Sequence, residues 1–527
     1  MKFPLVLFIL LLSAALSCLS VYPTYANESK VQRPNIVVIL ADDMGYSDLG
    51  CYGGEIKTPH LDRLAGRGLR FTQFYNTGRC WPTRAALLTG LYSAQTGVHD
   101  MSHQLNRNCM TIAEVLRPSG YGTYMVGKWH LMKDWKDPTT DRWPLQRGFD
   151  RFYGTPVAGS FFNPHNPIRD REPVKIKDKD YYVTDALTDN AIKYIRTHST
   201  YRKDDPFFLY VAHFAPHWPL HARPKDIEAH RGLYDKGWDA VRSARHKRMI
   251  ELGILKEHWK LSRPETQSPS WKNAKNKKWE SRRMETHAAM VHRMDYGIGR
   301  IIDTLTKTGQ LENTLVFFLS DNGASSENLG RVPGFEYKKT LNNRPVRGGN
   351  NPAIMPGPAD TYQSFGRRWA NVSVTPFRKY KAFSHEGGIA TPLIVHWPKG
   401  ISAQGELRHQ PSHVIDIMAT CVEVSGSMYP NEHLGKSIHP PEGVSLTPAF
   451  ADKSLDRDAL YFQHLGNRAI RVGKWKLVAL KGKPWELYDL ETDRTETNNL
   501  IDKHPSQSSE LAKMWEAWRQ DYKNKPK

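Results

Sequence analysis

Cysteine is scarce in this chain, with five residues among 527. Proteins whose fold depends on disulfides are short and rich in cysteine, so this class of protein is excluded. Cys18 falls in an N-terminal segment that we expect to be removed. The sequence leaves open whether Cys51, Cys109 or Cys421 form a disulfide, and Cys80 needs a separate explanation.

Long hydrophobic runs are also rare. The run Phe3–Leu16 follows Lys2 and is shorter than the ~20 residues that span a bilayer. No later segment of the sequence has the composition of a membrane helix. The pattern predicts a secretory signal peptide at residues 1–26, cleaved after Ala26, with an uncleaved anchor as the alternative. We therefore expect an exported protein, periplasmic or secreted, without a stable membrane anchor.

Acidic residues are outnumbered, since 54 Asp and Glu stand against 74 Lys and Arg, giving a formal net charge of +20. This excess predicts a polyanionic partner without identifying it: nucleic acid, anionic lipid and sulfated or phosphorylated substrates all fit. Nearly half of the excess lies between Arg242 and Arg283, where 13 basic residues stand against four acidic ones. This stretch is either a solvated helical insertion or a docking surface for a polysulfated chain.

Four short apolar runs end abruptly in polar residues, at 36–41, 123–126, 207–212 and 315–319. Such runs are typical of strands buried on both faces, and helix-like stretches separate them at 112–116, 184–197 and 286–306. The alternation predicts an α/β fold with a large, mostly parallel central sheet flanked by helices. Ligands bind beyond the carboxyl ends of such strands. The polar residues there are Asp42, Asp43, Lys128, His130, His213, His217, Asp321 and Asn322.

The last part of the chain has a different pattern. Short strand-like runs at 460–462, 468–472, 475–480 and 485–490 are separated by Gly or Pro and followed by a helical stretch at 507–522. This pattern predicts a small antiparallel sheet with one helix. We therefore divide the mature chain into a main domain, residues 27–451, and a smaller C-terminal domain, residues 452–527. Residues 333–358, rich in Gly, Asn and Pro, predict a long loop.

Asp42, Asp43, Asp321 and Asn322 offer only oxygen atoms as ligands. Such a set suits a hard cation, Ca²⁺ or Mg²⁺, better than zinc. Two adjacent carboxylates repel one another unless a cation lies between them. The alternative interpretation is that these residues cap the helices that follow.

Three histidines, His213, His217 and His221, are spaced four residues apart, as zinc ligands on one face of a helix would be. Pro216 and Pro219 exclude a helix here, so the zinc interpretation fails. We predict an extended loop that presents one or two histidines. His221 and His213 are expected to be structural.

Cys80 opens a predicted helix, with Pro82 in its first turn and Gly90 at its end. At a helix N-terminus, backbone N–H groups and the helix dipole favour an anion. Arg84 would project toward the same place. The position predicts a lowered pKa for the Cys80 thiol and, from physics alone, a thiolate nucleophile.

The segment Cys80-Trp81-Pro82-Thr83-Arg84, followed by Leu87-Leu88-Thr89-Gly90, resembles the signature of the sulfatase family, Cys-x-Pro-x-Arg with Leu-Thr-Gly downstream. The resemblance covers most of the mature chain and, around 216–255, is closest to bacterial arylsulfatases. Its other motifs run from Pro34 to Asp43, Gly127 to His130, Ala215 to Pro219, Ser320 to Gly323 and Lys381 to Gly388. This family is the formylglycine-dependent branch of the alkaline phosphatase superfamily.

The resemblance implies that the main domain is a sulfuric ester hydrolase and that a maturation enzyme oxidises Cys80 to Cα-formylglycine. One hydroxyl of the hydrated aldehyde attacks sulfur, and the alcohol leaves. The second hydroxyl then loses its proton and expels sulfate. One Ca²⁺, with Mg²⁺ possible, would be held by Asp42, Asp43, Asp321, Asn322 and the modified Cys80.

The resemblance also implies roles for five further residues. Arg84 and Lys128 would steady the diol, and His130 would be the base of the second step. His217 and Lys381 would bind the sulfate group, together with Lys128, and protonate the leaving oxygen.

Three departures from the family pattern concern maturation or substrate contacts. Thr83 replaces the commoner Ser, and Ala390 stands where relatives often have Arg. Ala158 lies near the place of a sulfate-contacting Ser, with Ser160 out of register. No core catalytic group is missing.

Two other functions remain as alternatives. One is a hydrolase of phosphodiesters or phosphonate monoesters in the same superfamily, and the other is a non-catalytic polyanion-binding protein, which would need a damaged site. Nucleic acid is not an expected partner. The expected substrate is an aryl or carbohydrate sulfate, including sulfated polysaccharide or oligosaccharide.

Overall fold

The computed structural model describes residues 33–133, 135–155, 159–164, 167–264, 269–330 and 338–524. The signal peptide predicted at residues 1–26 lies outside them. From Pro34 onward the chain forms one compact unit. Among the described helices, none combines the length and the hydrophobicity needed to cross a membrane.

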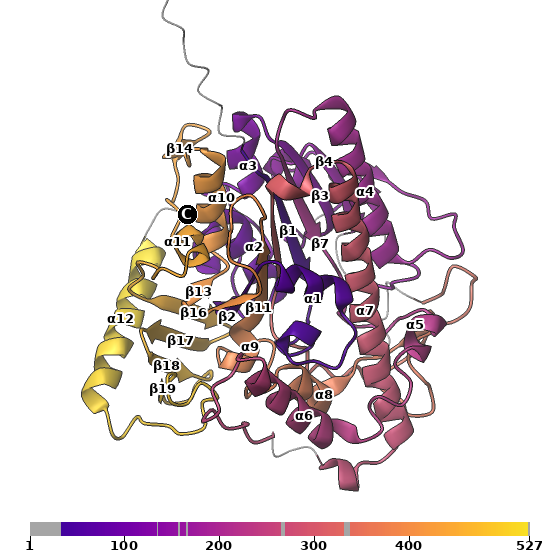
Figure 1. Ribbon diagram of the computed structural model, residues 1–527, viewed down its shortest axis with the longest axis vertical. Helices are drawn as coiled ribbons and strands as arrows, with labels where there is room; N and C mark the ends of the chain where they lie inside the picture. The colour runs from indigo at the N-terminus through magenta and orange to yellow at the C-terminus, as the bar shows by residue number, and fades with distance from the viewer. Residues whose placement is uncertain are drawn as a thin grey trace, which may run out of the picture. The chain divides into compact units, whose positions relative to one another are not determined.

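A large mixed sheet runs through the protein and contains eleven of the described strands (Figure 1). Its centre is a parallel block in the order β8 (Thr314–Ser320), β1 (Asn35–Ala41), β7 (Phe207–Ala212), β3 (Gly122–Lys128) and β4 (Arg151–Thr155). On one side β11 (Ala390–His396) runs antiparallel to both β8 and β2 (Leu69–Tyr75). The edges are formed by β12 (Glu406–Arg408), β13 (Ser412–His413), β5 (Ile168–Arg169) and β6 (Glu172–Pro173).

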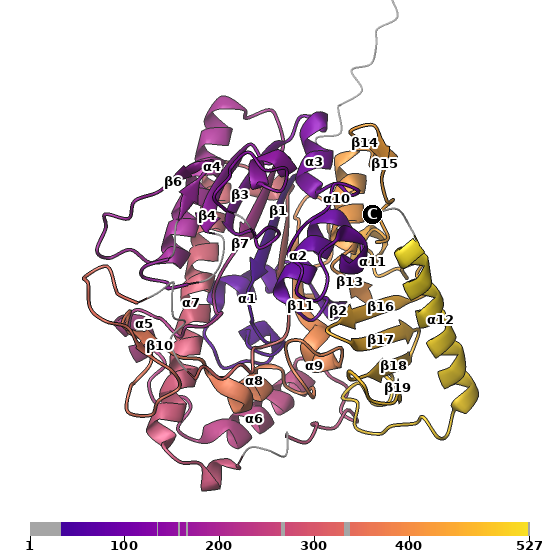
Figure 2. The same cartoon turned by 180° about the vertical axis from the view of Figure 1, so that it is seen from behind.

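Helices cover both faces of this sheet, as Figures 1 and 2 show from opposite sides. Alternate residues of β1 pack into the two core layers on opposite faces of the sheet, because successive side chains of a strand point to opposite faces. Val37 and Ile39 belong to the core beneath α1 (Pro59–Gly66), α4 (Val183–Tyr201) and α7 (Lys277–Lys307). Ile36 and Val38 belong to the core beneath α2 (Cys80–Thr89), α3 (Ile112–Leu116) and α10 (Asp416–Ser425).

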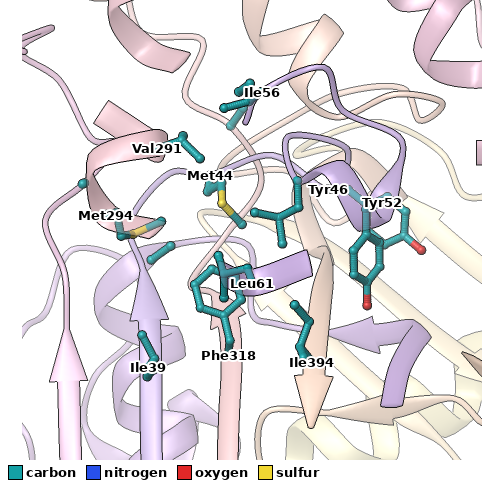
Figure 3. Close-up of a cluster of buried hydrophobic side chains, with 14 of the residues drawn as sticks. Ile39, Met44, Tyr46, Tyr52, Ile56, Leu61, Val291, Met294, Phe318 and Ile394 are labelled. Atoms are coloured by element: carbon teal, nitrogen blue, oxygen red, sulfur yellow. The ribbon is translucent and has the colours of Figure 1, made fainter. Parts of the chain in front are cut away.

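Figure 3 shows part of the first core layer. Ile39 of β1 and Phe318 of β8 lie beneath Leu61 of α1 and near Met294 of α7. Each of these four side chains is fully buried. The helices are therefore fixed on the sheet by apolar side chains that interdigitate with the strands.

The residues after 452 form a smaller antiparallel sheet with one long helix along it (Figure 2). Its strands are β16 (Leu460–His464), β17 (Asn467–Val472), β18 (Trp475–Ala479) and β19 (Glu486–Asp489), and the helix is α12 (Pro505–Asn524). Ile470 and Leu477 of the sheet pack with Leu511 and Trp515 of the helix.

Shorter elements connect these layers. The helices are α5 (Pro224–Glu228), α6 (Gly237–Glu251), α8 (Gly366–Ser373), α9 (Glu386–Ile389) and α11 (Thr447–Phe450). Two short strand pairs are β9 (Arg347–Gly348) with β10 (Thr361–Tyr362), and β14 (Glu432–His433) with β15 (Lys436–Ser437). Of the loop expected at 333–358, residues 333–337 lie outside the described part, and β9 lies in the remainder.

The predicted fold class is confirmed, with two differences in detail. The apolar runs are β1, β3, β7 and β8, but the antiparallel strand β11 was not predicted. Pro392 interrupts it at a register shift between Thr391 and Leu393, and proline in a sheet is confined to such irregular positions or edges. Helix α7 begins at Lys277 rather than near 286, because Trp279 and Met284 extend its buried face.

Candidate active site

The carboxyl ends of the neighbouring parallel strands β1 and β8 bring four oxygen-bearing side chains together. Ala41 pairs with Ser320, so the residues that follow each strand lie side by side. Asn322 Nδ2 donates to Asp43 Oδ1 at 2.6 Å, and the Asp43 amide donates to Asp321 Oδ1 at 3.2 Å. Asp42 completes the group, and all four side chains are buried.

Three cationic side chains surround these carboxylates. Lys128, the last residue of β3, places Nζ 2.6 Å from Asp42 Oδ2. Arg84 of α2 lies 2.7 Å from Asp321 Oδ2, and Lys381 of the loop before α9 lies 2.8 Å from Asp43 Oδ1. Burial by itself raises the pKa of Asp42, but Lys128 and the other cations outweigh it and hold that pKa well below its usual range.

The donor atoms fit a hard cation. Asp42 Oδ1 and Asn322 Oδ1 are buried and accept no hydrogen bond from the described residues. Oxygens of Asp42 and Asp321 lie with Cys80 Sγ within 4.8 Å of one another. Burial and the neighbouring Asp42 raise the pKa of Asp321 to about 7, and a divalent cation would restore its ionised form. An all-oxygen carboxylate and amide set suits Ca²⁺ or Mg²⁺.

Cys80 is the first residue of α2, and the helix ends at Thr89, followed by Gly90 in the left-handed region at φ 71°. The structure thus places the thiol at the helix N-terminus. The predicted acidity of Cys80 is wrong, however, because burial raises its pKa and Lys128 and Lys381 only partly offset this effect. The residue is 2% exposed, so an unmodified Cys80 stays a neutral thiol at neutral pH. The structure describes Cys51, Cys109 and Cys421 as free thiols too.

His217 lies in the loop after β7, facing the carboxylates. Its Nδ1 is 2.6 Å from the backbone oxygen of Trp218, which can only accept a hydrogen bond. Nδ1 therefore carries a proton, and Nε2 is the atom that gains or loses one. Nε2 lies 3.5 Å from Asp43 Oδ2. Burial lowers the pKa of His217, while Asp43 and Asp42 act in the opposite direction.

His130 lies just beyond β3, and its Nδ1 is buried without a hydrogen-bond partner among the described residues. Burial lowers the pKa of His130 well below its usual value, and the positive charge of Lys128 lowers it further. The ring is thus neutral at neutral pH, so one of its two nitrogens has a free lone pair. His130 and Asp43 adopt φ of 59° and 65°, which is uncommon for non-glycine residues.

Two glycines allow the close backbone approaches that assemble the site. Gly127 has φ 108°, and a Cβ there would lie 1.8 Å from the backbone oxygen of Ala212 on β7. A Cβ on Gly323 would lie 1.9 Å from the backbone oxygen of Gly387. A side chain at Gly127 would push β3, which ends at Lys128, away from β7, and one at Gly323 would push the segment after β8 away from α9, which follows the Lys381 loop.

The two histidines that we expected to be structural are fully buried. His221 Nε2 contacts the backbone oxygen of Thr361 at 2.7 Å. Burial lowers the pKa of His213 to about 3, so its ring is neutral. Of the other noted positions, Ala390 is buried at the start of β11 opposite Tyr75, and Ala158 lies outside the described residues.

The residues that hold the Lys381 loop were not predicted from the sequence. Glu386 Oε1, at the start of α9, lies 2.8 Å from Lys476 Nζ, which also contacts Glu496 Oε1 at 2.8 Å. Glu496 Oε2 accepts a hydrogen bond from the Glu386 amide, and Arg494 Nε lies 3.2 Å from Glu386 Oε2. These side chains are at most 1% exposed. Nothing in the local sequence of the C-terminal strands indicates this network.

The basic stretch 242–283 is partly structural. Arg242 is buried and donates to the backbone oxygen of Pro376. Arg245 is buried and lies 2.7 Å from both Asp48 Oδ1 and Glu55 Oε1. Part of the local charge thus stabilises the fold. The exposed lysines of the stretch include Lys275, just before α7, and Lys277 and Lys278, its first two residues.

Models of known families match nearly the whole described chain. The sulfatase model matches residues 34–427. A model of the C-terminal part of N-sulphoglucosamine sulphohydrolase matches residues 378–523. The two matches overlap in the segment that contains Lys381 and Glu386.

Individual proteins are similar over most of their lengths. An uncharacterized sulfatase of Schizosaccharomyces pombe is 32% identical, with 93% of this chain and 94% of that protein covered. An arylsulfatase of Klebsiella aerogenes is 33% identical, with 82% and 96% covered. The crystal structure of Ps i-CgsB superposes with a TM-score of 0.68 at 25% identity, covering 92% of this chain and 93% of that one. The same protein has been crystallised in complex with k-i-k-neocarrahexaose.

Proposed function

Because the chain belongs to the sulfatase family, whose members hydrolyse sulfate esters, we propose that it releases inorganic sulfate from an aryl or carbohydrate sulfate ester. In this proposal a maturation enzyme converts Cys80 to Cα-formylglycine, and the exported protein, periplasmic or secreted, binds one Ca²⁺. The observation that carries the proposal is the buried cluster in which Cys80 Sγ lies within 4.8 Å of oxygens of Asp42 and Asp321.

The charge of the cluster suits a sulfate ester. With one divalent cation bound by Asp42, Asp43, Asp321 and Asn322, three cationic side chains leave the site net positive. Such a site attracts a sulfate monoanion and stabilises the charge that develops on its oxygen atoms in the transition state. The cation would supply Lewis-acid polarisation of those oxygens.

The protonation states fit the two proton transfers that the reaction needs. The hydrated formylglycine would supply the attacking hydroxyl group, beside Lys128 and Arg84. His217 Nε2 is the exchangeable position, and a bound anion beside it favours the protonated ring that would give its proton to the leaving oxygen. Lys381 would bind the sulfate group at the same side. His130, neutral through burial, would accept the proton in the second step.

Purified enzyme is expected to hydrolyse 4-nitrophenyl sulfate at least about 100-fold faster in kcat/KM than the matching aryl phosphodiester. A terminal sulfate presents three unsubstituted oxygens to the cationic groups, whereas a diester presents two and carries a second bulky group. Initial rates of nitrophenol release check this. The reverse ranking would favour the alternative, a phosphodiester or phosphonate monoester hydrolase with the same site. Activity on neither of these substrates nor on any sugar sulfate, with formylglycine present, would favour a polyanion-binding protein.

Replacing Lys275, Lys277 and Lys278 by glutamine is expected to raise KM several-fold for a sulfated polysaccharide at low salt, and less at high salt. The reason is that exposed lysines attract a polyanion through a screened, long-range field. Kinetics at two ionic strengths check the effect. A variant with glutamine at Lys179, Lys203 and Lys307, also exposed, has the same net charge and serves as control. Equal KM values for the two variants would contradict the docking surface and favour the solvated helical insertion.

A further inference from the structure

The turn between β16 and β17 lies beside the active site. Leu465 N donates to Asp100 Oδ1 at 2.7 Å. Asn467 Nδ2 donates to the backbone oxygen of Ala382, next to Lys381, at 2.9 Å. His464, the last residue of β16, lies with its ring 6.0 Å from that of Trp81, which follows Cys80 in the chain. The turn therefore lies between the neighbour of Cys80 and the neighbour of Lys381.

A second histidine lies at the same place. The ring of His103 is 4.3 Å from that of Trp81 and 5.0 Å from that of His130. His464 is 2% exposed, and its Nε2, like that of His103, is buried without a hydrogen-bond partner in the described part of the chain. Buried polar atoms are normally paired, so these two ring nitrogens, which lie around the residue that follows Cys80, remain available to hydrogen-bond a ligand.

The chemistry of these rings favours a neutral ligand. Burial lowers the pKa of His103 to about 4 and that of His464 to about 3, with contributions from Lys133 and Arg79 respectively. At neutral pH each ring thus has one donor and one acceptor nitrogen, a set that complements a hydroxyl group. Arg79 stacks on Trp81 and pairs with Glu327 at 3.7 Å, so its positive charge is partly neutralised. It therefore attracts a second anionic group of the substrate less strongly than an unpaired arginine would.

We propose that His103 and His464 bind hydroxyl groups of a carbohydrate that carries the scissile sulfate ester. This inference rests on the proposed sulfatase activity and specifies its substrate class. The sulfate group would occupy the cationic cluster, and the sugar ring would extend along Trp81 toward the β16–β17 turn. An aryl group offers no hydroxyl at this position, so these two side chains would discriminate between the two substrate classes.

The test compares sugar and aryl substrates in variants of the full chain. The unaltered enzyme is expected to hydrolyse at least one of the 6-sulfates of N-acetylglucosamine, N-acetylgalactosamine and galactose. His464→Leu and His103→Leu should each lower kcat/KM for that sugar sulfate about 10- to 100-fold, the effect of an unpaired polar contact. The loss for 4-nitrophenyl sulfate should be at least about ten-fold smaller. His464→Gln, which keeps a donor and an acceptor, should recover most of the sugar activity.

Controls separate this inference from folding and from the proposed function. His99→Leu changes an exposed histidine near His103 and should alter neither rate. Melting temperatures check that the variants fold. Equal losses for both substrates, or a Gln variant no better than the Leu variant, would overturn the inference. So would an enzyme that hydrolyses the aryl sulfate and none of the three sugar sulfates. Failure to hydrolyse any sulfate ester would instead count against the proposed function.

Discussion

Cys80→Ala is expected to lower kcat for sulfate-ester hydrolysis by about four to six orders of magnitude, as loss of a nucleophile does in other hydrolases. The free energy of unfolding should change by only about 1 kcal/mol, because a small buried side chain becomes slightly smaller. Activity assays on aryl and sugar sulfates and denaturant unfolding measure both effects. The physical reason is that the carboxylates and cations around Cys80 bind and polarise the ester but supply no nucleophile.

The matched control is Cys421→Ala, which removes another buried thiol, on α10. This variant should keep full activity. Mass spectrometry of the peptide that contains Cys80 adds an independent check, since conversion to formylglycine removes about 18 Da relative to cysteine. Substantial activity in Cys80→Ala would contradict the proposed mechanism. An unmodified thiol in fully active enzyme would do the same.

Lys476→Met is expected to lower the free energy of unfolding by about 3–5 kcal/mol, the cost of breaking a buried ion pair by removing one partner. Lys476 Nζ lies 2.8 Å from carboxylates of both Glu386 and Glu496. Without it, Glu386 keeps its contact with Arg494 Nε, whereas the ion pair between Lys476 and Glu496 is lost. Because Glu386 opens α9 behind the Lys381 loop, KM for a sulfate ester should rise as well. Urea unfolding and steady-state kinetics measure the two effects.

Lys474→Met provides the comparison for this prediction. Lys474 is 42% exposed and pairs with Asp489 at 2.9 Å, so its loss should lower the free energy of unfolding much less than the loss of Lys476. The double variant Lys476→Met/Glu496→Gln should regain part of the stability, because it removes one uncompensated charge. If Lys476→Met is no less stable than Lys474→Met, the network does not stabilise the loop.

The parallel core could be predicted from sequence because strands buried on both faces leave continuous apolar runs. β1, β3, β7 and β8 all appear in this way. β11 could not, because Pro392 divides a short run and the strand's antiparallel direction depends on its partners. The N-terminal third of α7 was missed because basic residues dominate it and only its tertiary contacts show which face is buried.

The site was predictable to the extent that its residues follow strand ends or form short motifs. Asp42, Lys128 and Asp321 belong to this group. The high pKa of the Cys80 thiol was not predictable, because position at a helix N-terminus is visible in the sequence but burial is not. His464 and Lys476 lie far along the chain in ordinary strands, and only packing brings them to the site.

The ion network around Glu386 has a consequence for how such chains can recombine. Glu386 lies before the predicted boundary at 451, whereas its partners Lys476, Arg494 and Glu496 lie after it. A chimaera that joins two relatives at this boundary would take residue 386 from one parent and its buried charged partners from the other. Exchange of the C-terminal part therefore succeeds only between parents that carry the same set of buried charges, or when residues 378–386 are exchanged with it.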